Sequence, residues 1–257
     1  MSPSTLTTRS SNAQIRSAIP QGTTMRHADS TLYQRLLALC PLKSSATQYL
    51  LQRAISAKTI SQFKVGQVSD SKSTAARLID EFGYTRADEA GVLFRDKWKR
   101  SVRLIFPNHS LVFPFLDHGR IIYMQARSLQ HQSPGRKWWN LVARPRQIFN
   151  VDALSSKAAE RIAICEGVID TMSAVEFDYT AFGILGIHMR LAVNQLHELR
   201  GKEVHILLDW DSPGEAAAIT LQQELARYGI HSVRKTRPSP RANDLNDYLR
   251  EQRGLST

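Results

Sequence analysis

The chain has 257 residues, with 34 Lys and Arg against 23 Asp and Glu, so its formal net charge is +11. No stretch approaches the roughly 20 consecutive apolar residues that a membrane-spanning helix needs, so an integral membrane protein is not expected. The two cysteines, Cys40 and Cys165, are too few for a disulfide framework or a cysteine-based zinc ribbon. We therefore expect no zinc and a reducing, cytoplasmic setting.

The charge is distributed unevenly along the chain. Residues 95–146 carry eleven cations against two acidic residues, a net charge of +9, whereas residues 160–253 carry 11 cations and 14 anions. A basic half beside an acidic half is typical of a protein that holds a polyanion next to a cluster of carboxylates. A solvated basic face without a ligand is the alternative interpretation of the charge alone.

Residues 1–30 are predicted to form a disordered tail. The first 28 residues are rich in Ser, Thr, Gln and Arg, contain no acidic residue and show no apolar periodicity. A transit peptide is a second interpretation of this composition, and Met25 is an alternative start of the protein.

Residues 31–94 are predicted to form short helices, because apolar residues recur there at helical spacing. Ser56 and Ser73 stand where the N-caps of two of these helices are expected. Three glycines are predicted to lie at helix ends or turns, namely Gly66, Gly83 and Gly91.

Residues 102–129 change to β character. The runs 110–116 and 120–126 are rich in β-branched and aromatic residues and flank the turn-forming Asp117-His-Gly119, so a hairpin is predicted. Together with the helices, this segment predicts a basic α+β subdomain over residues 31–157.

Residues 158–254 alternate apolar strands with amphipathic helices, which is typical of a parallel α/β sheet. The predicted fold class is therefore α/β, with a Rossmann-like parallel-sheet domain behind the basic α+β subdomain. Strands are expected over 161–165, 179–185, 204–208 and 230–236, and helices over 168–175 and 191–200, from Ser212 to Gly229, and from Asp244 to Arg250.

Acidic residues directly follow two of these strands. Glu166 follows the strand 161–165, and Asp209 and Asp211 follow the strand 204–208. The carboxyl ends of parallel strands form the ligand-binding edge of such a sheet, and residues two apart in an extended segment point the same way. Carboxylates with room for water are the ligands that Mg²⁺ prefers, so a divalent-cation site is predicted.

An isolated Asp-x-Asp pair is more often a helix cap or a turn than a metal site. Here Ser212 is expected to be the N-cap, in the capping box Ser212-Pro-Gly-Glu215, which leaves both aspartates for a cation. Asp244 and Asp247, three residues apart at the start of the last helix, add carboxylates on one helix face.

Three segments resemble, in order and spacing, the motifs of the Toprim domain: Cys165-Glu-Gly-Val-Ile-Asp170, Leu208-Asp-Trp-Asp-Ser-Pro-Gly214 and Asn243-Asp-Leu-Asn-Asp247. Toprim domains occur in bacterial primases, type IA and II topoisomerases, OLD-type nucleases and recombination-mediator proteins. The resemblance implies that Glu166 is required for catalysis and that Asp209 and Asp211 bind metal. It also implies that Asp170 and Asp244 support the metal site.

The preceding residues resemble the DnaG-type primase core. Residues 46–63 are similar to the helical start of that core, and Val112-Phe-Pro-Phe-Leu-Asp117, a turn and then Arg127 are similar to its hairpin. Lys137-Trp-Trp-Asn140 stands where primases have Lys-Tyr-Leu-Asn. The resemblance implies a basic cleft for template and nucleotide phosphates, formed by Arg127, Lys137, Asn140, Arg144 and Arg146.

The resemblance implies a primase, a DNA-directed RNA polymerase that makes short primers on single-stranded DNA from nucleoside triphosphates with Mg²⁺ or Mn²⁺. A Toprim nuclease and a non-catalytic nucleic-acid-binding module are the alternatives. The family's zinc ribbon and helicase-binding tail are not found in this sequence, and Asn243 stands where a lysine is common. We therefore expect a partner helicase or a zinc-binding protein supplied by another chain.

Overall fold

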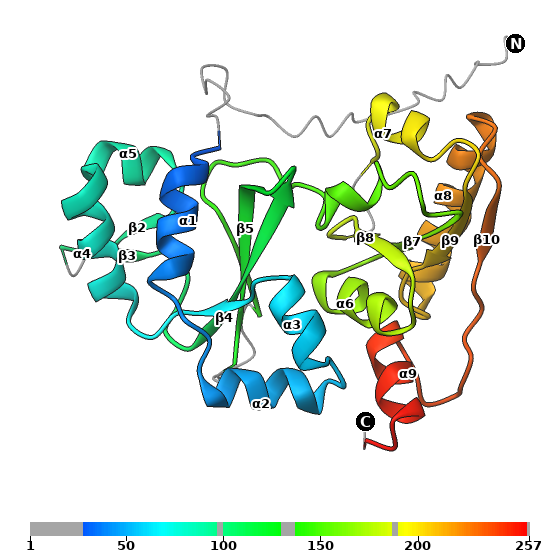
Figure 1. Ribbon diagram of the computed structural model, residues 1–257, viewed down its shortest axis with the longest axis horizontal. Coiled ribbons are helices and arrows are strands. Elements are labelled where there is room, and N and C mark those ends of the chain that lie inside the picture. Colours follow the sequence, from blue (N-terminus) through cyan, green and yellow to red (C-terminus); the bar gives the residue numbers. More distant parts are fainter. Residues whose placement is uncertain (1–27, 97–99, 130–136, 187–189, 256–257) are drawn as a thin grey trace, which may run out of the picture.

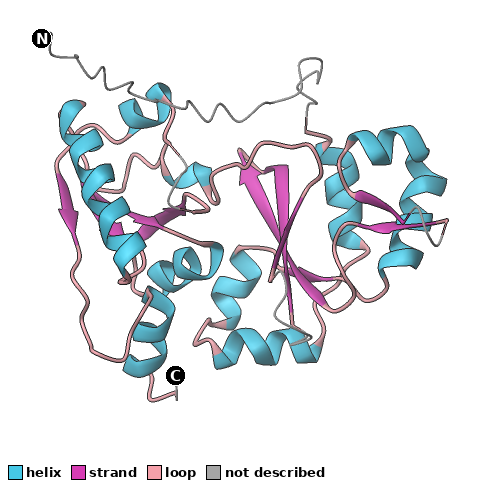
Figure 2. Cartoon of the chain, turned by 180° about the vertical axis from the view of Figure 1, so that it is seen from behind, coloured by secondary structure: helices cyan, strands magenta, loops and turns pink. Residues whose placement is uncertain are grey.

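The computed structural model describes residues 28–96, 100–129, 137–186 and 190–255. Figures 1 and 2 show an antiparallel sheet in the middle of the molecule and a parallel sheet at one end, with helices around both. The predicted tail lies almost entirely outside the described residues. None of the described helices is long and apolar enough to cross a membrane.

The N-terminal part combines short helices with antiparallel strands. Its main sheet runs in the order β1-β4-β5-β6, and β2 pairs with β3 in a separate hairpin. The helices are α1 (Ser30–Ala38), α2 (Ser44–Gln52), α3 (Ala57–Gln62), α4 (Ser71–Phe82) and α5 (Tyr84–Glu89). The strands are β1 (Gly66–Gln67), β2 (Leu93–Asp96), β3 (Ser101–Leu104), β4 (Ser110–Asp117), β5 (Arg120–Ser128) and β6 (Trp138–Asn140).

The hairpin of β4 and β5 confirms the sequence prediction. Its turn residues His118 and Gly119 have φ angles of 49° and 75°, the left-handed conformation at both positions that characterises a type I′ hairpin turn. At the far end of β5, Arg127 pairs with Trp138 of β6. This pairing places the end of the predicted strand beside the Lys-Trp-Trp-Asn segment.

The C-terminal part is a parallel sheet in the order β10-β9-β7-β8, which confirms the predicted α/β class. Strand β7 is central because four of its five residues are buried apolar side chains. Cys165 at its end lies opposite both Gly183 and Leu207, so three strands end at one edge. The strands are β7 (Arg161–Cys165), β8 (Thr180–Gly183), β9 (Glu203–Leu207) and β10 (Ser232–Arg234). The helices are the 3₁₀ turn η1 (Val151–Ala153), α6 (Val168–Glu176), α7 (Val193–Glu198), α8 (Ser212–Arg227) and α9 (Leu245–Gln252).

One hydrophobic core joins the two parts. Val168, Ile169 and Met172 of α6 are buried in the same cluster as the aromatic residues of the antiparallel sheet. Phe149 and Gly183 of β8 exchange two backbone hydrogen bonds, each N–H donating to the other residue's carbonyl. The centre of the Phe149 ring lies 5.0 Å from that of Phe115 on β4. The parallel sheet is therefore packed directly against the N-terminal part.

Among the local predictions on the helical segment, those for Ser56 and Gly83 are confirmed and those for Ser73 and Gly66 are wrong, since Gly83 is the C-cap of α4. Ser56 caps α3 by accepting a hydrogen bond from the Thr59 N–H at 3.2 Å, as predicted. Ser73 does not cap α4, because the helix already begins at Ser71. Its N-cap is Asp70, whose side chain accepts hydrogen bonds from the backbone N–H groups of Lys72 and Ser73. Gly66 lies in strand β1, where a Cβ would approach the Cys40 carbonyl oxygen to 2.6 Å, so close packing of the backbone requires the glycine.

A buried asparagine on α9 connects this last helix with the end of α2 and with α6. Asn246 on α9 is fully buried, and its Nδ2 donates to the Arg53 carbonyl at 2.8 Å and to Ser173 Oγ at 2.9 Å. Its Oδ1 accepts from Arg53 Nη1 at 3.0 Å. One side chain thus satisfies polar groups on both parts of the chain.

Replacing Asn246 by alanine leaves these buried groups without partners. Asn246→Ala is expected to lower the free energy of unfolding by about 2–4 kcal/mol. Urea denaturation at equilibrium measures this, with Asn194→Ala on an exposed position of α7 as the matched control. A change equal to that of the control would show that the buried network contributes nothing.

Candidate active site

A cleft of about 550 Å³ lies between the antiparallel sheet and the carboxyl edge of the parallel sheet. The N-terminal part contributes mainly basic and amide side chains to its lining, and the C-terminal part contributes the carboxylates. The lining consists of Arg53, Gln125, Arg127, Lys137, Trp138, Asn140 and Arg146 from the first part and Glu166, Gly167, Val168, Ile169, Asp170, Leu185, Gly186, Asp209 and Asp244 from the second.

The cleft carboxylates Glu166, Asp170, Asp209 and Asp244 form an acidic wall. The register of the parallel sheet determines where this wall lies. Glu166 directly follows β7, and Asp209 follows β9 by two residues. The Trp210 N–H donates to the Asn243 carbonyl at 2.8 Å, which holds the segment after β9 against the start of α9. Asp244 is the N-cap of α9, and its side chain accepts from the Asp247 N–H at 2.7 Å.

The carboxylates of this wall destabilise one another's charges. Burial raises the pKa of Asp209 to about 7, with further contributions from the negative charges of Glu166 and Asp244. Burial is also the main cause of the raised pKa of Glu166, which a hydrogen bond from the Asp209 backbone N–H partly offsets. The pKa values of Asp170 and Asp244 are raised for the same reasons.

Asp170 shows that the wall fits a cation. Its Oδ1 is buried and accepts no hydrogen bond from any described residue. A buried carboxylate oxygen without a donor is costly unless a positive group neutralises it. Hard divalent cations bind such oxygens, so Glu166, Asp170, Asp209 and Asp244 form a donor set of the right chemistry.

Asp211 caps helix α8, a role that the sequence prediction gave to Ser212. Its Oδ1 accepts from the Gly214 N–H at 2.8 Å, and Ser212 is the first helical residue, so the predicted cap at Ser212 is wrong. The chain is tightly packed at this turn and requires a glycine, since a Cβ at Gly214 would lie 2.2 Å from the Asp209 carbonyl oxygen. Asp211 is exposed and is not among the described residues that line the cleft, but its charge still raises the pKa of Glu166.

Arg127 dominates the basic wall. Its guanidinium lies 5.2 Å from the Trp138 ring and 5.8 Å from the Tyr49 ring, so it is held between two aromatic faces. Burial lowers the pKa of Arg127, and the charges of Asp170 and Asp244 oppose that change. The acidic and basic walls are therefore close enough to affect each other's charge.

The other predicted cleft residues lie around Arg127. Lys137 is exposed at the start of β6. The Nη1 of Arg146 donates to the Leu185 carbonyl at 3.0 Å, which fixes that guanidinium at the cleft. Asn140 Oδ1 accepts from Tyr123 Oη and Gln125 Nε2, both at 3.1 Å, so the amide NH₂ is the group that remains for a ligand.

Arg53 is a cleft residue that the sequence prediction did not single out. Its guanidinium lies 5.6 Å from the centre of the Tyr49 ring, four residues earlier in the chain, and its positive charge partly offsets the rise in the pKa of Asp244. The signals in the sequence are the helical spacing of Tyr49 and Arg53 and the resemblance of residues 46–63 to the start of the primase core, and neither gives Arg53 a role. Its contact with Asn246, 193 residues away, belongs to the tertiary structure.

Comparisons with known proteins agree with this two-part architecture. A family model described as the DNA primase catalytic core, N-terminal domain, matches residues 32–150, and a Toprim-like model matches residues 163–249. The chain has the catalytic core of the DnaG-type primases. The resemblance inferred from the sequence motifs is thereby confirmed.

Individual relatives support the same assignment of the primase core. A DNA primase of Geobacillus stearothermophilus is 25% identical over 231 residues, which cover 85% of this chain and 37% of the relative. The RNA polymerase domain of Mycobacterium tuberculosis primase superposes with a TM-score of 0.70 at 19% identity, covering 89% of this chain and 81% of that domain. A DnaG catalytic domain bound to single-stranded DNA gives a TM-score of 0.65 at 21% identity, covering 88% and 77%. This chain spans about a third of the length of the curated relatives it matches.

Arg144 lies outside the cleft of the primase core. Its Nη2 donates to the Glu89 carbonyl at 2.9 Å, beside the turn that follows α5. A Cβ at Gly91 in that turn would lie 3.4 Å from Arg144 Cγ. The structure therefore places Arg144 against the helical edge of the N-terminal part and separates it from Arg127, Lys137 and Arg146.

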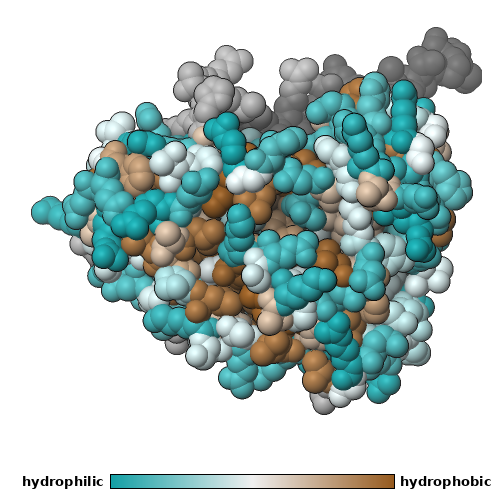
Figure 3. All heavy atoms as spheres, viewed as in Figure 1, coloured by the Kyte–Doolittle hydropathy of each residue, from teal (hydrophilic) through white to brown (hydrophobic). Residues whose placement is uncertain are grey.

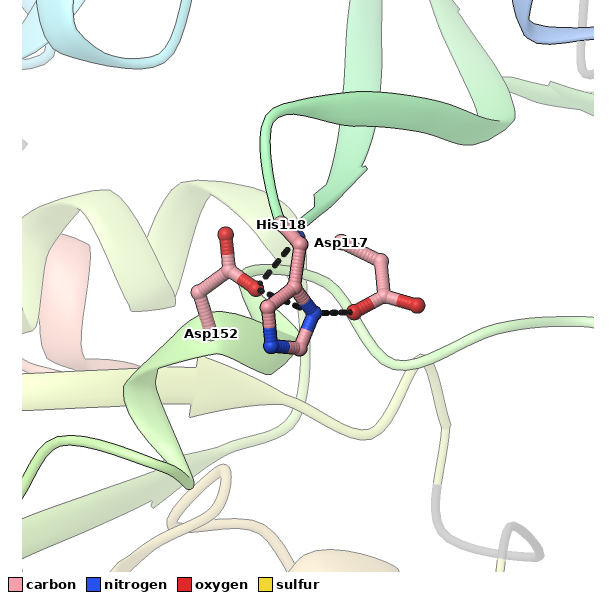
Figure 4. A group of neighbouring side chains, drawn as sticks. All are labelled: Asp117, His118 and Asp152. Carbon is pink, nitrogen blue, oxygen red and sulfur yellow. Dashed lines mark hydrogen bonds and ion pairs between the residues drawn. The ribbon is translucent and has the colours of Figure 1, made fainter.

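An exposed group elsewhere on the primase core combines Asp117, His118 and Asp152 (Figure 4). The Asp117 carboxylate lies 2.7 Å from His118 Nδ1, and Asp152 Oδ1 accepts from the His118 backbone N–H at 2.8 Å. These contacts tie the hairpin turn of β4 and β5 to η1. The hydrogen bond to the Asp117 carboxylate is the main cause of the raised pKa of His118, and the negative charges of Asp117 and Asp152 add to it.

The raised pKa of Asp209 predicts that the folded protein becomes less stable as this carboxyl group ionises. Because the folded state binds this proton more tightly than the unfolded state, its contribution to the free energy of unfolding is complete below about pH 4 and is lost as the pH rises to about 7. Asp209→Asn should therefore raise the melting temperature of the metal-free protein by a few degrees at about pH 8, with little change at about pH 4.

Thermal unfolding at both pH values, with and without Mg²⁺, measures this effect. Mg²⁺ should stabilise the natural chain and have a smaller effect on Asp209→Asn. Asp80→Asn, at an exposed position of α4, is the matched control. Equal melting temperatures for Asp209→Asn and the natural chain at about pH 8 would contradict the repulsion argument.

Proposed function

We propose that the chain synthesises short RNA primers on single-stranded DNA from nucleoside triphosphates. The observation that carries this proposal is that partly buried carboxylates and basic side chains face each other across one cleft. Primer synthesis needs both, since the reacting phosphates are polyanionic and the charge that develops on them has to be stabilised. The solved DnaG domain bound to single-stranded DNA supports DNA as the template class.

The carboxylates are proposed to hold Mg²⁺ or Mn²⁺. Toprim domains bind divalent metals, and the donor set of Glu166, Asp170, Asp209 and Asp244 fits such a cation. One carboxylate oxygen of Asp211 accepts a hydrogen bond from the Gly214 N–H. We propose that Asp211 acts on the cation through its other oxygen and its negative charge. When bound, the cation supplies charge stabilisation at the phosphates and a lower pKa for the attacking hydroxyl.

The proposed reaction is nucleotidyl transfer. The 3′-hydroxyl of one nucleotide gives its proton to solvent water, and its oxygen forms a bond to the α-phosphorus of the next. The bond from that phosphorus to the bridging oxygen breaks, and pyrophosphate leaves with that electron pair. Arg127, Lys137 and Arg146 are proposed to bind phosphate oxygens and align them with the carboxylates. Trp138, which lines the cleft and packs against Arg127, offers an aromatic face for a base.

The proposal includes the setting of the reaction. Both cysteines are free and buried, which agrees with a reducing compartment such as the cytoplasm and removes them as zinc ligands. A helicase or a zinc-binding element would have to come from outside these 257 residues.

Primer synthesis by the purified full chain tests the proposal. With single-stranded DNA, labelled nucleoside triphosphates and Mg²⁺ or Mn²⁺, short RNA products are expected. Glu166→Gln and Asp209→Asn should each reduce product by about 100-fold or more, because each removes a charged donor from the acidic wall. Asp80→Asn should retain full synthesis. Shortened DNA without new oligonucleotides would indicate a nuclease, and binding without either product would indicate a non-catalytic module; both results contradict the proposal.

DNA binding tests the basic wall separately from catalysis. Lys137→Ala should weaken single-stranded DNA binding several-fold and reduce the salt dependence of log Kd by about 0.7, because one phosphate contact is lost. Arg144→Ala, the matched loss of a cation outside the cleft, should leave both quantities nearly unchanged. Fluorescence anisotropy over a salt series measures both, and equal effects of the two variants would place the DNA elsewhere.

A further inference from the structure

A second concave surface lies on the helical side of the N-terminal part, away from the cleft. It is a groove of about 580 Å³ between the end of α1, the start of α2, and α3. Apolar side chains dominate its lining, and the characteristic ones are Leu37, Leu42, Ile60 and Val65. Figure 3 shows hydrophobic residues gathered over the region that holds α1 and α3 in Figure 1.

The groove has a cationic rim. Lys64 lines it, and Lys43 and Lys58 directly follow the lining residues Leu42 and Ala57. All three lysines are exposed, and none forms an ion pair with a described residue. Residues 41–69 contain four cations and no Asp or Glu, and the carboxylate of Glu176 that reaches this segment accepts from the Ser56 backbone N–H and not from one of the three lysines.

The start of α2 adds a second preference for negative charge. Lys43 is the N-cap of this nine-residue helix and makes no side-chain capping bond, and the first turn contains no acidic residue. The N–H groups of an uncapped helix start carry partial positive charge and bind carboxylates. Leu42 and Thr47, on either side of this start, both line the groove.

We propose that this groove docks a partner protein through an acidic amphipathic helix. Apolar side chains at helical spacing would fill the space between α1 and α3, and flanking Asp or Glu side chains would meet the lysine rim and the start of α2. The charge pattern raises the association rate and selects acidic over basic helices.

Nucleic acid fits this groove less well than it fits the cleft. No aromatic side chain lines the groove, whereas proteins that bind single-stranded nucleic acid combine a cationic groove with aromatic side chains on which the bases stack. The cleft contains Trp138 and Arg127 for that purpose. The two surfaces therefore differ in the class of partner that their side chains recognise.

The groove can be monitored by one engineered thiol. Cys40 and Cys165 are the only cysteines of the chain, and burial raises the pKa of the Cys40 thiol to about 12 and that of the Cys165 thiol well above its usual range. Both thiols are therefore unreactive at neutral pH. Ser61→Cys, at an exposed lining position, can be labelled selectively with an environment-sensitive fluorophore on the otherwise intact chain.

The probe is a synthetic helical peptide of about 14 residues with Leu at positions i, i+3, i+4 and i+7 and Glu elsewhere. A matched peptide has Lys in place of every Glu. The acidic peptide is expected to change the fluorescence of the label saturably, and the basic peptide to bind at least tenfold more weakly. In the label carrier, Lys43→Glu with Lys64→Glu should weaken acidic-peptide binding at least tenfold, whereas Lys72→Glu, an exposed lysine of α4 outside the groove, should not.

Several results would overturn the proposal. Equal binding of the two peptides, or equal loss in the Lys72→Glu control, would show that the rim does not select acidic partners. A response to single-stranded DNA would assign the groove to nucleic acid. If the fluorescence of the label changed with protein concentration alone, the groove would be assigned to a second copy of the chain. If the fluorescence changed when residues 1–27 were removed, the groove would be assigned to that segment. Primer synthesis by Lys43→Glu with Lys64→Glu should equal that of the natural chain, which separates this proposal from the proposed function.

Discussion

Strands β7 and β9 pair in parallel with Cys165 opposite Leu207, and this register brings two acidic segments to one edge of the sheet. Glu166 follows the first strand at once and Asp209 follows the second by two residues, so a shift of register would separate them along the edge. The hydrogen bond from Trp210 to Asn243 then brings the start of α9 and Asp244 to the same place. The acidic wall is thus a consequence of backbone pairing.

The wall opposes the stability of the fold that builds it. Burial and mutual repulsion raise the pKa values of Glu166, Asp170 and Asp209, so keeping these groups ionised at neutral pH costs folding free energy. Groups that strain a fold in this way are characteristic of functional sites. The half-buried Arg127 provides part of the compensation, and a bound cation would add to it.

The two parts of the chain form one structural unit around the cleft. Helix α6 places its apolar face in the N-terminal core while Asp170 on the same helix lines the cleft. Asn246 joins α9 to the end of α2, where Arg53 reaches the cleft from the other side. The α1–α3 groove lies on the same helical segment, so α2 connects the proposed catalytic and docking surfaces.

The sequence by itself determined the local elements and the chemical types of the site. The apolar run of β7, the turn between β4 and β5, and the carboxylates Glu166 and Asp209 were predictable because strand periodicity, turn conformation and position after a strand are properties of neighbouring residues. Only the tertiary structure decided which side chains meet. In the folded chain Asp211 caps helix α8, and Arg144 donates a hydrogen bond to the Glu89 carbonyl. The Oδ1 of Asp170 is buried, and Arg53 donates a hydrogen bond to Asn246. These outcomes depend on the packing of segments far apart in the chain, and local pattern does not specify distances between such segments.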